Sequence, residues 1–207
     1  MDKRATNEYP LHDLLQRRWS PRAFSRKAIS TDVLGSLFEA ARWSPSGGNE
    51  QPWRFLVTRN GETAFNNLFG TLSGRNSEWA GNAPILILTL AKTISSSGRP
   101  NRHAYYDLGQ AVANLTAQAT VHDLFVHQMG GYDAEKARAL FNIPAEYDLV
   151  TVIAIGYYGD TGALNEELQQ RETAGRVRKP LSEIVFDGAM DTPLALNVQV
   201  QVVEGQP

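Results

Sequence analysis

Two arginines and a serine alternate near the start of the sequence, as Arg18, Ser20 and Arg22. In an extended segment, alternate side chains project to the same side. Guanidinium groups and a hydroxyl held together in this way can donate hydrogen bonds to phosphate oxygens. The spacing therefore predicts an anion-binding arm. A solvated basic loop is the alternative, because short motifs of this kind also arise by chance.

A second segment, rich in small residues, runs from Ser44 to Trp53 and reads SPSGGNEQPW. Glycine lets a backbone approach a flat ligand because no side chain intervenes. The amides of Asn49 and Gln51 can both donate and accept hydrogen bonds. The segment predicts a small-residue cradle that faces the arm, and an ordinary helix-to-strand loop is the alternative.

The hydrophobic pattern predicts the elements that must position these two segments. We expect helices over residues 11–15, 31–41, 64–72, 103–125, 133–141 and 164–173, and strands over 53–58, 84–90 and 149–157. Thr31 and Asp32 are candidate caps for the second helix. The run 84–90 is continuously apolar, which is typical of a strand buried on both faces. Residues 93–101 are rich in Ser, Gly and Pro, and predict a mobile surface loop.

Composition excludes several classes of function. The chain of 207 residues suits one domain or a domain with a tail, and its formal net charge of −2 gives no general attraction to nucleic acid or to an anionic membrane. The absence of cysteine excludes disulfides, thiolate nucleophiles and iron–sulfur ligation. The histidines show no metal-ligand spacing, so we predict no metal site. The sequence shows neither a signal-peptide core nor an apolar run of about 20 residues, and we predict a soluble, cytoplasmic protein whose redox chemistry would need a bound cofactor.

The two segments resemble the FMN-dependent nitroreductases. That family carries Arg-x-Ser-x-Arg/Lys-x-Phe, then a helix, then Ser-Pro-Ser-x-x-Asn-x-Gln-Pro-Trp, as residues 18–24 and 44–53 stand here. The resemblance continues in order from roughly Leu11 to Phe186. It includes Ala83-Pro84, the stretch from Asp107 to Leu115, Ile155-Gly156-Tyr157, and the closing element from Arg176 to Val185.

The resemblance implies an α+β fold with a central, mostly antiparallel sheet flanked by helices, and with helix 103–125 at the centre of a dimer. It implies an FMN-binding domain over residues 1–186 and leaves 187–207 as a C-terminal extension. In that extension, apolar residues alternate with others from Leu194 to Val202, which predicts a strand exchanged or docked at the dimer interface. A flexible tail is the alternative.

The resemblance also assigns roles to individual residues. Two pairs of residues are implied to contact the phosphate and ribityl chain: an early pair, Arg18 and Ser20, and a late pair, Arg176 and Arg178. Trp19 belongs to the same cofactor-binding arm as the early pair. The wall beside the flavin ring is formed by Ser44, Pro45, Ser46 and Asn49. A strand-end segment consists of Gln128, Met129, Gly130 and Gly131, in which the backbone N–H of Gly130 faces flavin N5. A solvated charge run at 176–179 and a tight turn at 130–131 are the alternatives.

Two further residues are implied at the pyrimidine edge of the flavin, Arg22 and Asn76. A fixed positive charge there stabilises the reduced ring and so favours its reduction. Some family members carry a lysine three residues after the asparagine, whereas this chain has Trp79. We therefore expect Arg22 to carry more of the electrostatic role.

The implied function is an NADH- or NADPH-dependent oxidoreductase that passes hydride through flavin N5 to an electron-poor acceptor, such as a nitroaromatic or a quinone. The expected kinetics are ping-pong, and the expected assembly is a homodimer with FMN between subunits. No side chain stands out as an obligatory nucleophile or general acid, which fits chemistry performed by a cofactor. The alternatives within the same family are an enone or aldehyde reductase and a flavin-consuming or dehalogenating enzyme. Outside that activity, the alternatives are an FMN storage or sensor protein without turnover and a structural domain.

Overall fold

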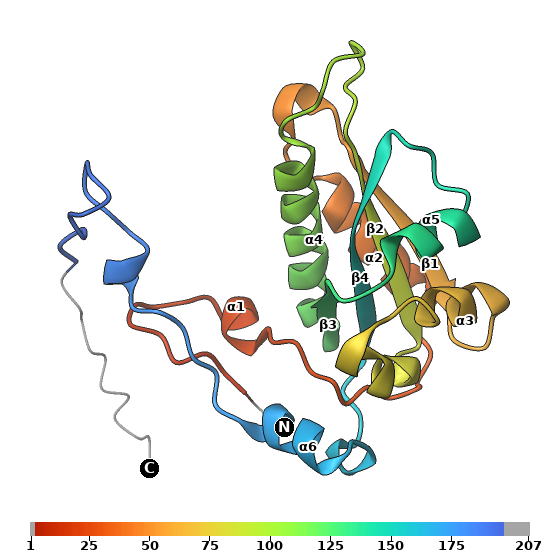
Figure 1. Ribbon diagram of the computed structural model, residues 1–207. Coiled ribbons are helices and arrows are strands. Elements are labelled where there is room, and N and C mark those ends of the chain that lie inside the picture. Colours follow the sequence, from red (N-terminus) through yellow and green to blue (C-terminus); the bar gives the residue numbers. More distant parts are fainter. Residues whose placement is uncertain (1–2, 197–207) are drawn as a thin grey trace. The chain divides into compact units, whose positions relative to one another are not determined.

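The computed structural model of the chain describes residues 3–196, drawn in colour in Figure 1. The chain divides into two compact units. The larger unit is Arg18–Thr173, and the smaller unit joins Met1–Arg17 to Ala174–Pro207. The predicted domain boundary at residue 186 stays a prediction.

A four-stranded sheet forms the centre of the larger unit. Its strands are β1 (Trp53–Arg59), β2 (Ile85–Lys92), β3 (Leu124–Met129) and β4 (Tyr147–Tyr157), and their order is β1-β2-β4-β3. Every neighbouring pair is antiparallel. The predicted antiparallel sheet is confirmed.

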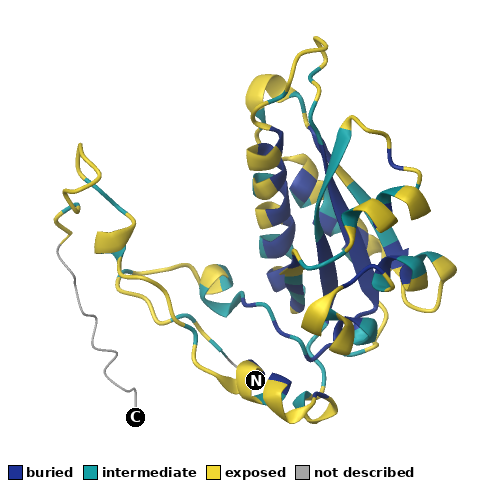
Figure 2. Ribbon diagram, viewed as in Figure 1, coloured by how far each residue is buried: buried dark blue, intermediate teal, exposed yellow. Residues whose placement is uncertain are grey.

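Helices cover both faces of this sheet, as the apolar run in β2 predicts. Ile85 and Ile87 point into one hydrophobic cluster, beneath α2 (Thr31–Arg42) and α4 (Ala104–Val121). Leu86 and Leu88 point into a second cluster, beneath α3 (Thr63–Phe69) and α5 (Ala134–Leu140). Figure 1 shows α4 on one side of the sheet and α3 and α5 on the other, and Figure 2 shows the buried residues gathered between these layers.

Several predicted element ends are wrong. The helix expected over 103–125 ends at Val121, and β3 begins at Leu124. The chain reverses through Asp123, whose φ of 54° lies in the left-handed region that ends a helix. The second helix is capped by neither expected residue, because the hydroxyl of Ser30 accepts the N–H of Val33.

The remaining helix of the larger unit is α6 (Glu166–Thr173), which leads to the end of that unit. Short 3₁₀ turns complete both units: Gly47–Asn49, Gly74–Glu78, Ala80–Asn82, Thr161–Ala163 and Leu181–Glu183. No helix within residues 3–196 is both long and apolar enough to cross a bilayer.

The smaller unit has a different character. It contains α1 (Asp13–Arg17), and none of its described residues, 3–17 and 174–196, is buried (Figure 2). One guanidinium links its two segments, because Nη1 of Arg176 donates to the carbonyls of Lys3 and Gln16 at 2.8 and 2.9 Å. The strand predicted from Leu194 to Val202 lies mostly outside the described residues. Its exchange across a dimer stays a prediction.

Candidate functional site

The arm, residues 18–24, lies against the chain just after β4. The N–H of Ser25 donates to the carbonyl of Tyr157 at 2.9 Å, and the N–H of Gly159 donates to the carbonyl of Ala23 at 2.8 Å. A Cβ atom at Gly159 would lie 2.4 Å from the carbonyl carbon of Phe24. This close approach therefore requires glycine.

Exposure alternates along the arm. Every second residue from Trp19 to Ala23 is buried, whereas Arg18, Ser20 and Arg22 are partly exposed. The alternation is that of an extended segment with one face on the core. The two arginines and the serine therefore share the outer side of the arm, as their spacing predicts.

Aromatic rings fix the buried side of the arm. Trp19 packs against Phe125 and Tyr158, with ring centroids 5.9 and 5.5 Å apart. Phe24 stacks on Trp79 at 5.9 Å. Trp79 is almost fully buried, so the residue at this position contributes packing. A contact between Trp19 and a cofactor stays a prediction.

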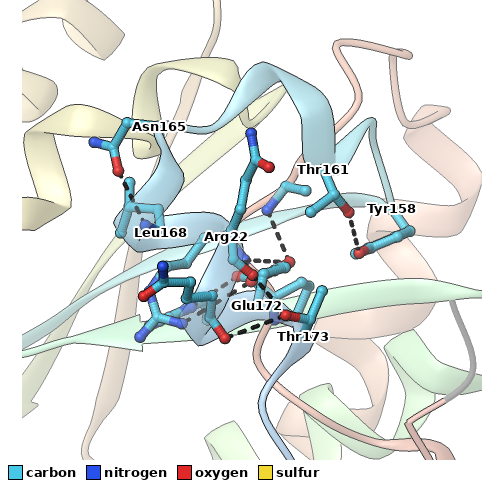
Figure 3. Close-up of polar contacts among 12 residues, drawn as sticks. Arg22, Tyr158, Thr161, Asn165, Leu168, Glu172 and Thr173 are labelled. Atoms are coloured by element: carbon cyan, nitrogen blue, oxygen red, sulfur yellow. Dashed lines mark hydrogen bonds and ion pairs between the residues drawn. The ribbon is translucent and has the colours of Figure 1, made fainter.

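A buried carboxylate lies beneath the arm, where Glu172 in α6 is fully removed from solvent (Figure 3). The backbone N–H of Arg22 donates to its two oxygens at 3.0 Å each, and the N–H of Ala23 donates at 3.1 Å. The guanidinium of Arg22 forms a longer ion pair, at 3.9 Å. Burial lowers the pKa of Arg22, and the nearby Glu172 opposes that shift.

The arm is also tied to strand β3 through His127. Nδ1 of this imidazole donates to the carbonyl of Pro21 at 2.8 Å, and its ring lies 4.4 Å from the ring of Trp79. Burial lowers the pKa of His127 to about 4, against the opposing effect of the bond to Pro21. The ring is therefore neutral at physiological pH.

The strand end that follows β3 lies beside the loop that carries Asn76. The carbonyl of Gly131 accepts from the backbone N–H of Ser73 at 3.0 Å and from Nδ2 of Asn76 at 3.2 Å. A Cβ atom at Gly130 would meet nothing within 4 Å. The chain is therefore open on one side at Gly130, and Asn76 is hydrogen-bonded to the neighbouring Gly131.

The other two strand-end residues differ in exposure. Met129 is buried in the hydrophobic cluster beneath α3 and α5, whereas Gln128 is exposed. Met129 is thus a core residue, and its predicted contact with a cofactor stays a prediction.

The cradle, residues 44–51, is hydrogen-bonded to α4. Nδ2 of Asn114 donates to the hydroxyl of Ser44 at 2.8 Å, and the buried carboxylate of Asp107 accepts the N–H of Gly47 at 3.1 Å. Asp107 and Asn114 are two helical turns apart, so they share one face of α4. Helix α4 therefore sets the position of the cradle.

The cradle backbone turns sharply. Gly48, Asn49 and Gln51 have φ values of 59°, 58° and 46°. Asparagine adopts this left-handed conformation more readily than glutamine does. The hydroxyl of Ser46 accepts the N–H of Gln51 at 3.0 Å and closes the turn. Pro45 and Asn49 are exposed at its surface.

The structure thus joins several predicted site residues into one connected region. The arm, His127 and the strand end are linked through β3, and Asn76 is bonded to the strand end. Arg176 and Arg178 lie in the smaller unit. Nη1 of Arg178 donates to the carbonyl of Val177, and the predicted convergence of this late pair with Arg18 and Ser20 stays a prediction.

Sequence reasoning missed Glu172 and His127 as parts of this region. One signal was available for Glu172, because an acidic residue in the last turn of a helix opposes the helix dipole and needs another reason to be there. His127 sits in a strand and carries no local signal. Asp107 and Asn114 stood within a recognised motif, but their anchoring role could not be seen without the fold.

Comparisons with known proteins agree on one family. A model of the nitroreductase family matches residues 15–157. An uncharacterized 15.4 kDa protein of Mycolicibacterium smegmatis is 34% identical over 148 residues, which cover 68% of this chain and 99% of that protein. A provisional NADH dehydrogenase/NAD(P)H nitroreductase of Archaeoglobus fulgidus is 28% identical over 155 residues, 71% of this chain and 84% of that protein. A crystal structure of an oxidoreductase containing FMN aligns with a TM-score of 0.84 at 31% identity, covering 90% of this chain and 96% of the other.

Proposed function

Because the chain belongs to the nitroreductase family, we propose that it is an FMN-dependent oxidoreductase that takes hydride from NADH or NADPH and reduces electron-poor acceptors such as nitroaromatics or quinones. The observation that carries this proposal is the likeness, over 90% of the chain, to an oxidoreductase that contains FMN. FMN when bound supplies the redox chemistry, because its N5 can accept a hydride and the reduced ring can pass two electrons on.

The residues of the arm fit an anionic cofactor. Arg18, Ser20 and Arg22 lie on one partly exposed side of an otherwise buried segment. Arginine forks and a hydroxyl are suited to phosphate oxygens. We propose that Arg18 and Ser20 bind the phosphate and ribityl chain together with Arg176 and Arg178.

The residues around the strand end fit the polar edge of a flavin. The open side at Gly130 leaves room for a flat ring to approach the backbone, and Asn76 is held beside it by its bond to Gly131. We propose that Gly130 offers its N–H to N5 and that Asn76 reads the pyrimidine edge. Arg22 would place a positive charge where the ring becomes negative on reduction.

The cradle residues are proposed to line the ring from another direction, in a homodimer that binds FMN between its subunits. In support of an assembly, α4 exposes large side chains, with Tyr105 51% and Tyr106 71% exposed. Exposed aromatic residues are common at protein interfaces. Sedimentation at several protein concentrations tests the dimer, and a monomer that binds FMN stoichiometrically would contradict a shared site.

The first experiment is a visible absorption spectrum of the protein after FMN is added and the excess is removed. We then expect NADH or NADPH to bleach the flavin without oxygen, and a quinone or nitroaromatic to restore the oxidised spectrum. Flavin that binds but is not bleached would favour a storage or sensor protein. An acceptor series that includes an enone and an aldehyde distinguishes the reductases of this family.

A further inference from the structure

The arm rests on a charged group that the proposed function does not use, the carboxylate of Glu172. We propose that Glu172 is a positioning residue, which fixes the arm at Arg22 and thereby holds the guanidinium of Arg22 in place for a bound flavin. The part of this inference that concerns the flavin rests on the proposed function.

The fold directs this carboxylate at the arm. Helix α6 begins at a cap, because Oδ1 of Asn165 accepts the N–H of Leu168 at 2.9 Å. Leu168 is buried in the core, and Glu172 lies one turn later on the same face. Figure 3 shows Glu172 pointing from α6 toward Arg22. The cap and the buried leucine therefore fix where the carboxylate lies.

The distances indicate which contacts dominate. The three hydrogen bonds from the N–H groups of Arg22 and Ala23 measure 3.0 to 3.1 Å, whereas the guanidinium ion pair measures 3.9 Å. Hydrogen bonds to an ionised carboxylate are stronger than neutral ones. Glu172 thus fixes the backbone of the arm firmly and holds the guanidinium more loosely, which leaves Arg22 able to interact with a ligand.

Stability alone is a weak reason for a glutamate in this place. A buried ion pair can often be replaced by apolar side chains without loss of stability, because the desolvation cost offsets the attraction. A buried hydrogen-bonded charge can instead specify one conformation of the segment that it binds. Here that segment carries the one cation that we place at the pyrimidine edge.

Amide hydrogen exchange tests the contact itself and needs no flavin. In Glu172→Gln the backbone amides of Arg22 and Ala23 should lose about tenfold in protection, because one charged acceptor is replaced by a neutral amide. The matched control is Glu167→Gln on the same helix, whose carboxylate is half exposed and pairs with Arg75 and Arg171. Equal protection of the two arm amides in both variants would overturn the proposal.

The flavin midpoint potential tests the consequence for Arg22. Removing a negative charge near the ring would by itself raise the potential, whereas displacing Arg22 would lower it. If Glu172 positions Arg22, the displacement of Arg22 outweighs the lost negative charge, and Glu172→Gln lowers the potential, as Arg22→Ala does. In the double variant the potential should be no lower than in Arg22→Ala alone. A rise, no change, or simple additivity would overturn the positioning role.

Amide exchange and the flavin potential test the contact and the proposed function separately. If the wild type binds no flavin, the proposed function is wrong, and amide exchange still decides whether Glu172 fixes the arm. If Glu172→Gln does not fold, Glu172→Asp takes its place, because it keeps the charge but is too short to reach both amides. Full protection of both amides in Glu172→Asp would also contradict the proposal.

Discussion

The arm and the cradle are two polar segments of one unit, held in different ways. The arm has every second residue in the core and is fixed by several bonds to one buried carboxylate, Glu172. The cradle is largely exposed; one hydrogen bond joins it to each of Asn114 and Asp107 in α4, and its exposed end is bonded to Ser96 through Glu50. Segments with few buried contacts open at lower free energy than the core does. We expect changes at the arm to alter global stability, and changes at the cradle to alter ligand binding.

The largest effect should follow from Glu172→Ala, which removes the acceptor of two backbone N–H groups and the partner of Arg22. Breaking a buried pair from one side leaves polar groups unpaired, and we expect the free energy of unfolding to fall by about 3 kcal/mol. Urea unfolding measures this fall. Glu167→Ala, which removes a half-exposed carboxylate paired with Arg75 and Arg171, should change stability by no more than about 0.5 kcal/mol. A similar small change in both variants would show that the arm is not fixed by Glu172.

Acid should weaken the arm through His127. Burial lowers the pKa of this ring in the folded state to about 4, below its ordinary value of 6.5. The unfolded chain therefore binds the proton first as the pH falls, and stability is lost between pH 6.5 and about 4. Relative to pH 8, protonation of His127 should lower the free energy of unfolding by about 2 kcal/mol at pH 5 and by about 3 kcal/mol at pH 4.

The pH effect is read as a difference between two proteins, because carboxylates also titrate toward pH 4. His127→Gln keeps a side chain that can donate to Pro21 but cannot be protonated in this range. Urea unfolding at pH 8 and pH 5 should therefore show a smaller loss in the variant than in the wild type. Equal losses of stability in the two proteins would mean that burial does not lower the pKa of His127.

The cradle should respond differently when Asn114 is replaced by alanine. The lost hydrogen bond to Ser44 costs about 1 kcal/mol, and alanine in α4 regains roughly 0.6 kcal/mol of helix propensity. Stability should therefore change by less than about 0.5 kcal/mol. If the cradle binds FMN as proposed, the dissociation constant should rise about fivefold, which corresponds to about 1 kcal/mol.

Fluorescence titration of FMN measures that change, beside urea unfolding of the same sample. Glu39→Ala in α2 is a suitable control, because its exposed partners are Arg42 and Trp43. If Asn114→Ala lost as much stability as Glu172→Ala and kept its FMN affinity, the cradle would contribute to global stability and would not bind the ligand, contrary to our expectation.

The arm shows how much of this site could be read from the sequence. Alternation alone predicts that Arg18, Ser20 and Arg22 share one side, because a period of two is a local property of extended chain. The apolar run at β2 likewise predicts two covered faces. What failed was the end of α4, since the apolar pattern passes into β3 and only the left-handed turn at Asp123 separates them.

The anchors of the arm could not be predicted, for a physical reason. Glu172 is 150 residues from Arg22 along the chain, and His127 is 106 residues from Pro21. Which side chain meets which at such separations is set by tertiary packing, and no local pattern encodes it. For the same reason, no local pattern encodes which side chains Arg176 and Arg178 meet.

The smallest effect should come from the cradle turn itself, through Gly48→Ala. The φ of Gly48 is 59°, yet a Cβ atom would find its nearest neighbour, in Glu50, only 4.0 Å away. The cost is thus the left-handed conformation alone, about 1 kcal/mol, and alanine offsets roughly half of it by restricting the unfolded chain. We expect a loss of about 0.5 kcal/mol in urea unfolding. Gly35→Ala, within α2 and clear of neighbours, should instead add up to about 1 kcal/mol. A loss above about 1.5 kcal/mol for Gly48→Ala would mean that the cradle unfolds together with the core, as we expect of the arm.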